Sequence, residues 1–296
     1  MGMDDARRLL SRISWSVKPD EIDLLLSQAE SVVLQPMQDG LEASVHKLTL
    51  GDANYVLKAW DKSSRPDIAY QYRLLSALWG EGVPVSRPIG VGEDEEGHSV
   101  LLTSYDGAPL KKLDKQGQRK IAALMAAVHR YPYEASVEFR ACKYEFVGYF
   151  YPGISEHPDI RQLLLQLVED AKLKQEHIIH GDLHLGNLVE ADGRYVAIDW
   201  TNGQLGDPRY DLMWMVVITR LYVSERHAAG LKTAYLSLNA YPEEQLELFE
   251  AIAFLRWLLL HRHNYVPAPA KTKKTAIGII SDNRYLQNKN LFPPRD

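Results

Sequence analysis

The chain has 296 residues and a formal net charge of −5, and 46% of its residues are hydrophobic while 25% are charged. This composition is that of a globular protein, and the length suffices for one large domain or two lobes with a sizeable core. The absence of a basic excess argues against a nucleic-acid partner, because nucleic-acid-binding proteins neutralise phosphates with lysine and arginine.

The single cysteine, Cys142, excludes a disulfide within the chain and is typical of a reducing compartment. The first residues, MGMDDARRLLSR, lack the apolar core of a signal peptide. Arg220 and Arg256 interrupt the long apolar runs before these reach membrane-spanning length. We therefore expect a cytoplasmic protein that does not interact with a membrane.

The amino-terminal part of the chain has helical and then extended patterns. Residues 4–30 are interpreted as two short helices, the second of which begins near Pro19. The segments 31–37, 44–49 and 54–60 are predicted to be three consecutive antiparallel strands, because turn residues separate them.

The remaining elements follow from apolar spacing. A helix is predicted from residue 66 to about residue 79, and the segments 83–85 and 99–102 are interpreted as the last strands of the small sheet. Beyond this point the pattern becomes mostly helical, with apolar-striped helices expected at 116–130, 160–173 and 243–263 and a polar tail at 270–296.

The stretch from residue 177 to residue 211, HIIHGDLHLGNLVEADGRYVAIDWTNGQLGDPRYD, carries the strongest chemical signal. Asp182 and Asn187 lie five positions apart, and Asp199 follows twelve positions later at the end of a short apolar run. Phosphoryl transfer needs these groups, because a carboxylate can take the proton of the acceptor hydroxyl while amide and carboxylate oxygens bind Mg²⁺.

A transition-metal site is the alternative interpretation of this stretch, with His180 and His184 as ligands. That interpretation leaves Asn187 and Asp199 without a role, so the phosphoryl-transfer interpretation is favoured. His180 is then expected to pack beneath the loop and to hydrogen-bond it in place. His184 could be structural or could approach the substrate.

The motifs HGDLHLGN, IDW and GDPRYD resemble those of the aminoglycoside/choline phosphotransferase branch of the kinase-like fold. The resemblance covers most of the chain and is nearer to bacterial antibiotic phosphotransferases than to choline kinases. It implies a bilobal, protein-kinase-like α+β fold. The small antiparallel-sheet N-lobe would comprise residues 1–104, and the larger, mostly helical C-lobe residues 105–296.

The same resemblance implies ATP, or GTP, and Mg²⁺ as cofactors and a hydroxylated small molecule as acceptor. Asp182 would be the catalytic base, and Asn187 and Asp199 would bind the metal. The residues implied to bind the nucleotide are Gly40 in the loop after the first strand, Lys58 on the third strand, and Ser104 and Tyr105, to within a residue or two, between the lobes. Those implied to support the site are Gln71, His180, Asp207 and Asp211.

The position of Gln71 is a departure from the family pattern, in which a glutamate there pairs with the strand lysine. Glutamine can hydrogen-bond Lys58 but cannot neutralise it. Asp67, one turn earlier, could take over the pairing or could serve only the helix dipole. This departure supports a competing hypothesis, a nucleotide-binding pseudokinase without turnover, against which the retention of Lys58, Asp182, Asn187 and Asp199 argues.

The acceptor is less well defined than the reaction. The resemblance favours an aminoglycoside or another antibiotic, and hence a role in antibiotic resistance, while a choline-like amino alcohol or a sugar is the alternative. Arg256 interrupts an apolar helical stretch, where an unpaired guanidinium would be costly. It is interpreted either as an acceptor contact or, preferably, as the partner of a buried carboxylate.

Overall fold

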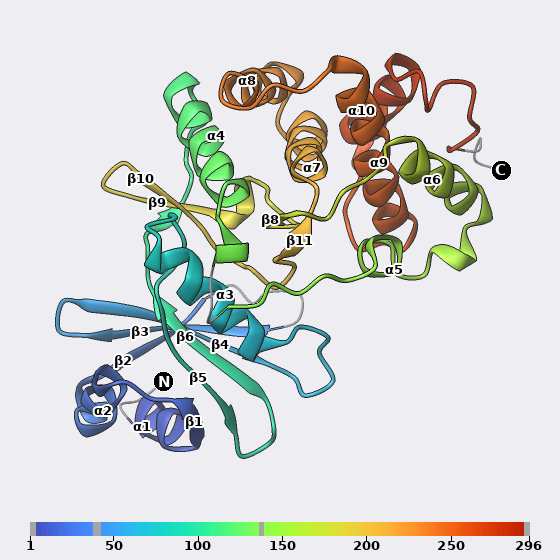
Figure 1. The fold of residues 1–296 in the computed structure, drawn as a ribbon. Helices are drawn as coiled ribbons and strands as arrows, with labels where there is room; N and C mark the ends of the chain where they lie inside the picture. The colour runs from blue at the N-terminus through green and yellow to red at the C-terminus, as the bar shows by residue number, and fades with distance from the viewer. Residues whose placement is uncertain (1–3, 38–42, 136–138, 293–296) are drawn as a thin grey trace. The chain divides into compact units, whose positions relative to one another are not determined.

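The computed structural model describes residues 4–37, 43–135 and 139–292 of the chain (Figure 1). Its contacts divide the chain into two compact units: unit 1, residues 1–108 and 189–202, and unit 2, residues 109–188 and 203–296. The segment 189–202, which the sequence interpretation assigned to the second lobe, therefore groups with the first. Within unit 1, the backbone N–H of Ala197 in this segment donates to Pro84 O over 3.0 Å.

Unit 1 is built on a six-stranded sheet in which every neighbouring pair is antiparallel. The strands lie in the order β1 (Ile13–Val17), β5 (Pro88–Asp94), β6 (Ser99–Ser104), β4 (Ala53–Trp60), β3 (Ala43–Leu50) and β2 (Val33–Pro36). The three consecutive strands predicted between residues 31 and 60 are confirmed as β2, β3 and β4. The structure thus has the expected α+β class.

Two details of this sheet differ from the prediction. The edge strand β1 lies between two helices and has only one fully buried residue, so its sequence carries almost no alternating signal. The predicted strand at 83–85 is not a ladder strand but a single bridge between Val85 and Ala197. The strand that pairs with β1 and β6 begins only at Pro88.

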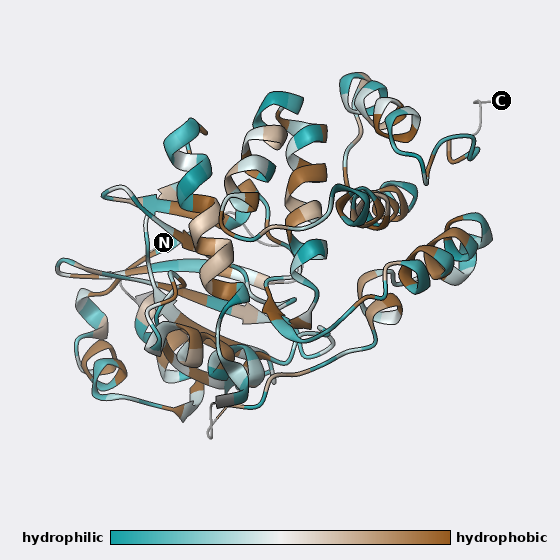
Figure 2. Ribbon diagram, turned by 45° about the horizontal axis from the view of Figure 1, so that its top comes forward, coloured by the Kyte–Doolittle hydropathy of each residue, from teal (hydrophilic) through white to brown (hydrophobic). Residues whose placement is uncertain are grey.

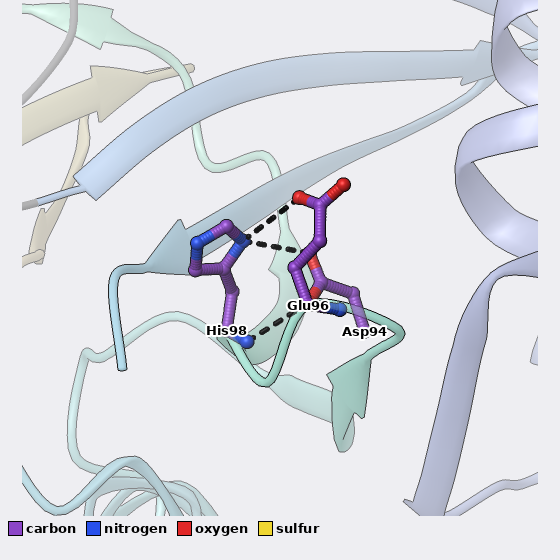
Figure 3. Close-up of side chains that lie close together, drawn as sticks. All are labelled: Asp94, Glu96 and His98. Atoms are coloured by element: carbon purple, nitrogen blue, oxygen red, sulfur yellow. Dashed lines mark hydrogen bonds and ion pairs between the residues drawn. The ribbon is translucent and has the colours of Figure 1, made fainter. Parts of the chain in front are cut away.

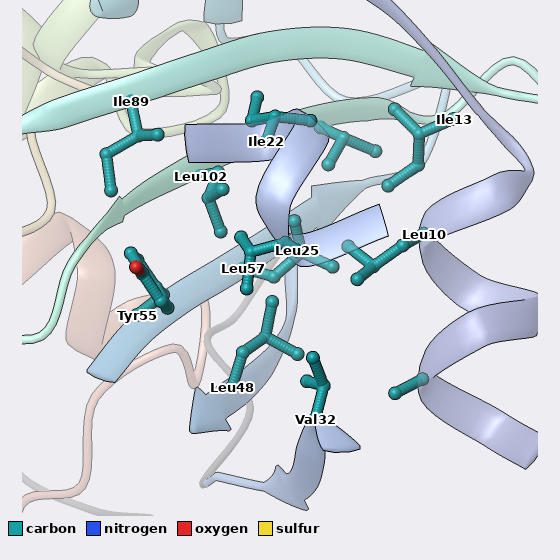
Figure 4. Close-up of a cluster of buried hydrophobic side chains, with 12 residues drawn as sticks. Leu10, Ile13, Ile22, Leu25, Val32, Leu48, Tyr55, Leu57, Ile89 and Leu102 are labelled. Atoms are coloured by element: carbon teal, nitrogen blue, oxygen red, sulfur yellow. The ribbon is translucent and has the colours of Figure 1, made fainter. Parts of the chain in front are cut away.

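Apolar side chains from helices α1 (Asp4–Ser11) and α2 (Asp20–Ser27) pack on one face of the sheet (Figure 4). Leu10 and Leu25 meet Tyr55 and Leu57 of β4 there. Complete burial of each large apolar side chain contributes about 1.5–3 kcal/mol, so this cluster stabilises the unit. Because side chains alternate along a strand, Lys58 points to the opposite face.

Helix α3 (Ile68–Gly80) packs against β5 and β6 and begins with Asp67 as its N-cap. The hairpin between these two strands is closed by polar contacts (Figure 3). The carboxylate of Asp94 accepts the backbone N–H groups of Glu96 and His98, and its second oxygen lies 2.9 Å from Nδ1 of His98. This hydrogen bond raises the pKa of the partly exposed His98 imidazole.

A second, three-stranded sheet has the order β10 (Arg194–Ala197), β9 (Leu188–Ala191) and β7 (Ala108–Pro109). Gly107, just before β7, has a φ of +118°, and a Cβ atom there would collide with the carbonyl of Glu190. Only glycine accommodates both the left-handed backbone and this close approach.

Unit 2 is mostly helical, and a short antiparallel pair, β8 (His177–Ile179) and β11 (Gln204–Gly206), lies among its helices. The helices are α4 (Lys115–His129), α5 (Phe146–Phe150), α6 (Pro158–Asp170), α7 (Pro208–Tyr222), α8 (Glu225–Leu236), α9 (Glu243–Arg262) and α10 (Ala270–Asp282). The predicted helices at 116–130, 160–173 and 243–263 are confirmed as α4, α6 and α9.

Residues 270–296 were expected to form a polar tail, but Ala270–Asp282 form helix α10. Thr272, Ala276 and Ile279 are buried at helical spacing, a stripe too polar and too short to stand out in the sequence. Most helices have both hydrophilic and hydrophobic residues (Figure 2). In α9, every residue from Ala251 to Leu259 is buried. Within the described ranges, no helix is both long and apolar enough to cross a membrane.

The ion pair between Glu21 of α2 and Arg87 gives a prediction for unit 1. Both carboxylate oxygens accept from the guanidinium at 2.9 Å, and these hydrogen bonds hold the pKa of Glu21 below its usual range. A lowered folded pKa contributes stability that is present above the unfolded pKa of about 4.3 and is lost as the pH falls through the folded value. We expect Glu21→Gln to remove this part of the acid dependence of the melting temperature.

Thermal melts at several pH values would measure the acid dependence of the melting temperature. Glu30→Gln is the matched control, because its pair with Arg7 is exposed on both sides and contributes little. An unchanged pH profile in Glu21→Gln would contradict the prediction.

Candidate functional site

The loop that follows β8 carries Asp182, and Asp211 fixes its backbone. The carboxylate of Asp211 accepts the backbone N–H of His180 over 3.0 Å and that of Gly181 over 2.9 Å. Gly181 has a φ of +77°, a left-handed conformation that glycine adopts without a steric cost. The loop thus turns sharply directly before Asp182.

Asp211 is itself held by a buried hydrogen-bond chain. It lies in the first turn of α7, and its Oδ2 is 3.1 Å from Nε2 of His129, whose Nδ1 lies 2.6 Å from the hydroxyl of Tyr235. Burial alone would raise the pKa of Asp211, but the hydrogen bonds from His129 and the His180 N–H outweigh it and keep this pKa below its usual range. The group that anchors the loop is therefore a carboxylate.

The side chain of Asp182 remains 27% exposed, and both of its oxygens have polar neighbours. Nη2 of Arg256 lies 3.3 Å from Oδ1, and Nε2 of His184 lies 3.9 Å from Oδ2. Arg256 also donates to the carbonyl of Gly181 over 2.6 Å. An accessible carboxylate of defined orientation is suited to receive the proton of a hydroxyl group.

Asn187 ends a short 3-10 turn, Leu185–Asn187, behind this loop. Its Nδ2 donates to the backbone carbonyl of Asp182 over 2.9 Å, which leaves the amide oxygen for a cation. His184 caps the turn, because its Nδ1 accepts the N–H of Gly186 over 3.0 Å. The structure thus gives His184 a capping contact in addition to its proximity to Asp182.

In unit 1, β4 carries Lys58 between Val45 of β3 and Leu101 of β6. Its Nζ lies 3.5 Å from Oδ1 of Asp199. Asp199 has a φ of +64°, which is uncommon outside glycine but is tolerated by aspartate and asparagine. A non-glycine residue held in this conformation is often functional.

Neither Gln71 nor Asp67 has a described contact with Lys58. Asp67 accepts the N–H of Tyr70 over 2.8 Å as the N-cap of α3, so its carboxylate serves the helix start. Gln71 is 3% exposed, and its Oε1 has no hydrogen-bond partner among the described residues. Lys58 instead pairs with the carboxylate of Asp199.

The implied adenine-binding backbone groups are partly used within unit 1. The N–H of Ser104 donates to Arg87 O over 2.9 Å, and that of Tyr105 donates to Asn54 O over 3.1 Å. Contacts from these two residues to an adenine would therefore need other atoms. Gly40, the residue implied to cover the phosphates, lies outside the described residues.

The remaining implied support residues lie in unit 2 beside the loop. His180 is buried, and its Nδ1 accepts the N–H of Asp182 over 3.3 Å. Asp207 caps α7 by accepting the N–H of Arg209, and it also accepts the backbone N–H of Lys174. These contacts hold the chain on both sides of the loop that carries Asp182, as structural residues do.

Sequence reasoning did not predict the contacts of two residues at this site. It singled out Arg256 but did not assign its partner, because Asp182 lies 74 positions away. It assigned no site role to His129, because nothing local predicted the contacts of this residue with Asp211 and Tyr235. The signal in the sequence was Arg256, a charged residue inside an apolar helix, because a buried charge needs a partner.

Several solved structures share this fold over most of the chain. Three of them are small-molecule kinases. A thermostable mutant of the aminoglycoside phosphotransferase APH(4)-Ia superposes with a TM-score of 0.64 at 18% identity, covering 88% of this chain and 99% of that one. Amicoumacin kinase hAmiN gives 0.63 at 14% identity, covering 91% and 96%. An ethanolamine kinase of Plasmodium vivax gives 0.62 at 12% identity, covering 95% and 94%. The expected kinase-like fold is thereby confirmed.

The sequence also matches the profile of the phosphotransferase enzyme family over residues 33–247. The chain belongs to this family, and it is a small-molecule phosphotransferase. No curated protein matches the chain in a sequence search.

The anchoring role of Asp211 can be tested by Asp211→Asn. An amide offers only one acceptor oxygen, so one of the backbone N–H groups of His180 and Gly181 would lose its partner. An unsatisfied buried donor costs about 1–3 kcal/mol, which should lower the melting temperature by several degrees and reduce activity.

Differential scanning calorimetry would measure this loss. Asp282→Asn is the control, because Asp282 pairs with Arg220 but is largely exposed, and its effect should stay within about 0.5 kcal/mol. Equal melting temperatures for the two variants would contradict the anchoring role.

Proposed function

We propose that this chain transfers the γ-phosphoryl group of ATP to a hydroxyl group of a small molecule, with Mg²⁺ as cofactor. The observation that carries the proposal is the catalytic loop of a phosphotransferase-family chain. There the partly exposed carboxylate of Asp182 follows a backbone turn that Asp211 and Arg256 hold on two sides. Phosphoryl transfer depends mainly on such positioning, since little covalent work falls to the protein.

Asp182 is assigned to the acceptor. Its carboxylate orients the hydroxyl and takes its proton as the oxygen attacks the γ-phosphorus. A new O–P bond forms while the bond between the γ-phosphorus and the β,γ-bridging oxygen breaks, and ADP leaves. Arg256 engages Oδ1 of Asp182, so Oδ2 is the atom assigned to the hydroxyl.

Lys58 and Asp199 are assigned to the nucleotide. The lysine ammonium binds phosphate oxygens, and its pairing with Asp199 over 3.5 Å holds it in place before the nucleotide binds. The carboxylate of Asp199 and the amide oxygen of Asn187 are the hard oxygen ligands that Mg²⁺ prefers, so the residues present fit this ion. When bound, Mg²⁺ supplies neutralisation of the phosphate charge.

The acceptor class proposed first is a hydroxylated antibiotic, and modification of such a compound would make the chain a resistance enzyme. This choice is supported by the sequence resemblance and by two structural neighbours. One of them is an APH(4)-Ia mutant crystallised with AMP-PNP and hygromycin B, and the other is amicoumacin kinase bound to AMP-PNP and Ca²⁺. The similar fold of an ethanolamine kinase supports an amino alcohol as the second class.

A screen for acceptor-dependent ADP release would test the proposal. The library should contain aminoglycosides, other hydroxylated antibiotics, amino alcohols and sugars, each with ATP and with GTP. Release of ADP with one of these classes, together with a gain of one phosphoryl group in the acceptor mass, supports the proposal. Nucleotide binding without turnover on any acceptor would instead support the pseudokinase alternative that Gln71 suggested.

Replacement of the proposed base is the most direct mutational test. Asp182→Asn should lower kcat by roughly 10²–10⁴-fold, because general-base catalysis contributes about that much. The Kd for ATP should change little, since Asp182 is assigned to the acceptor. Steady-state kinetics and isothermal titration would measure both quantities. The exposed Asp170→Asn in the same unit serves as control, and near-normal kcat in Asp182→Asn would refute the assignment.

Asp199→Asn tests the nucleotide side without altering the backbone, because asparagine also tolerates a positive φ. Loss of the negative charge should raise the Mg²⁺ concentration for half-maximal activity by at least about tenfold, a change of about 1.4 kcal/mol. Asp192→Asn is a matched control, since Asp192 is exposed, belongs to the same unit and has a φ of +52°. A Mg²⁺ requirement that Asp199→Asn leaves unchanged would exclude Asp199 as a metal ligand.

A further inference from the structure

Arg256 lies in the middle of α9, within the run of residues that are buried on all sides. It is 8% exposed, and its guanidinium lies over the ring of Trp214 at 4.1 Å and over that of Phe150 at 5.0 Å. The aromatic faces attract the cation and limit its movement. The side chain is therefore enclosed rather than presented to an acceptor.

The hydrogen bonds of this guanidinium go to the catalytic loop and to the residue before Asp211. Nη1 donates to the carbonyl of Gly181 over 2.6 Å and to the hydroxyl of Tyr210 over 3.0 Å, while Nη2 donates to Oδ1 of Asp182 over 3.3 Å. Burial raises the pKa of Tyr210, so that hydroxyl stays neutral. The negative charge that balances Arg256 among the described contacts is thus the carboxylate of Asp182.

The guanidinium, a rigid planar group, hydrogen-bonds both the backbone of Gly181 and the side chain of the next residue, Asp182. The two nitrogens of a planar guanidinium have a fixed separation, so contact with both Gly181 O and Asp182 Oδ1 restricts the rotation of the Asp182 side chain. Oδ1 is then engaged, and Oδ2 is left beside Nε2 of His184 at 3.9 Å. The two oxygens of the carboxylate therefore have different surroundings.

We infer that Arg256 is the positioning residue of Asp182: it acts on phosphoryl transfer by holding the carboxylate with Oδ2 toward the acceptor hydroxyl. The inference rests on the proposed function, since it assigns the orientation of the proposed base.

Two partly buried arginines of unit 2 distinguish this role from simple packing. Arg220 pairs with Glu225, Glu250 and Asp282, and Arg209 pairs with Asp207. None of these carboxylates is assigned to the acceptor or the nucleotide. Loss of Arg220 should therefore affect folding alone, whereas loss of Arg256 should also affect the chemical step.

The test compares Arg256→Met with Arg220→Met, both in the full chain and with an acceptor that the screen identifies. We expect Arg256→Met to lower kcat by on the order of 10²-fold, the usual consequence of a misplaced catalytic group, with the KM for ATP nearly unchanged. Arg220→Met should lower the melting temperature but leave the kcat of the folded protein near the wild-type value.

A double-mutant cycle identifies the route of the effect. If Arg256 acts through Asp182, Arg256→Met should cause little further loss of kcat in the Asp182→Asn background. An equal loss in both backgrounds would overturn the inference, as would a wild-type kcat in Arg256→Met. Should Arg256→Met fail to fold, Arg256→Lys decides. Its single ammonium lacks the two-nitrogen fork, so a loss of about tenfold is expected, and wild-type kcat would overturn the inference.

Failure of the proposed function would have a different signature. A wild-type chain that transfers phosphate to no acceptor would refute that function and the inference with it. An active wild type with an equally active Arg256→Met variant would refute the inference alone.

Discussion

The backbone from His180 to Asp182 is the constraint on which the rest of unit 2 depends. Its N–H groups at His180 and Gly181 donate to Asp211, and its carbonyl at Gly181 accepts from Arg256. Buried backbone groups must be paired, and a left-handed turn cannot pair them within a helix or a strand. Two charged side chains from two helices satisfy them instead, and one of the two also reaches the side chain of Asp182.

Much of the surrounding architecture places these two side chains. Asp211 lies in the first turn of α7, which Asp207 caps, and His129 at the end of α4 lies 3.1 Å from Oδ2 of Asp211, the oxygen that also accepts the His180 N–H. Helix α9 packs against α7 along a continuously buried stretch, which brings Arg256 to the loop. The geometry of the loop that carries Asp182 is thus determined by packing and hydrogen bonding within the unit, as preorganised sites require.

The elements that sequence reasoning found are those with local signals. Turn residues separate strands β2 to β4, helices α4 and α6 have apolar stripes, α9 has a long apolar run, and the short motifs from His180 to Asp211 identify the family. Strand β1 and helix α10 were missed because their buried residues are few. Asp67 was expected either to pair with Lys58 or to serve only the helix dipole, and the structure makes it the N-cap of α3. The pairs Arg256–Asp182 and His129–Asp211 could not be predicted, since packing of distant helices creates them.

The claim that the loop from His180 to Asp182 is fixed before any substrate binds can be tested by native-state amide hydrogen exchange in the substrate-free protein. If Asp211 holds the loop as described, the amides of His180 and Gly181 should exchange only through unfolding of the whole unit, with protection equal to that of the most protected amides of α7. Fast exchange of these two amides through local opening, while α7 stays protected, would contradict the claim.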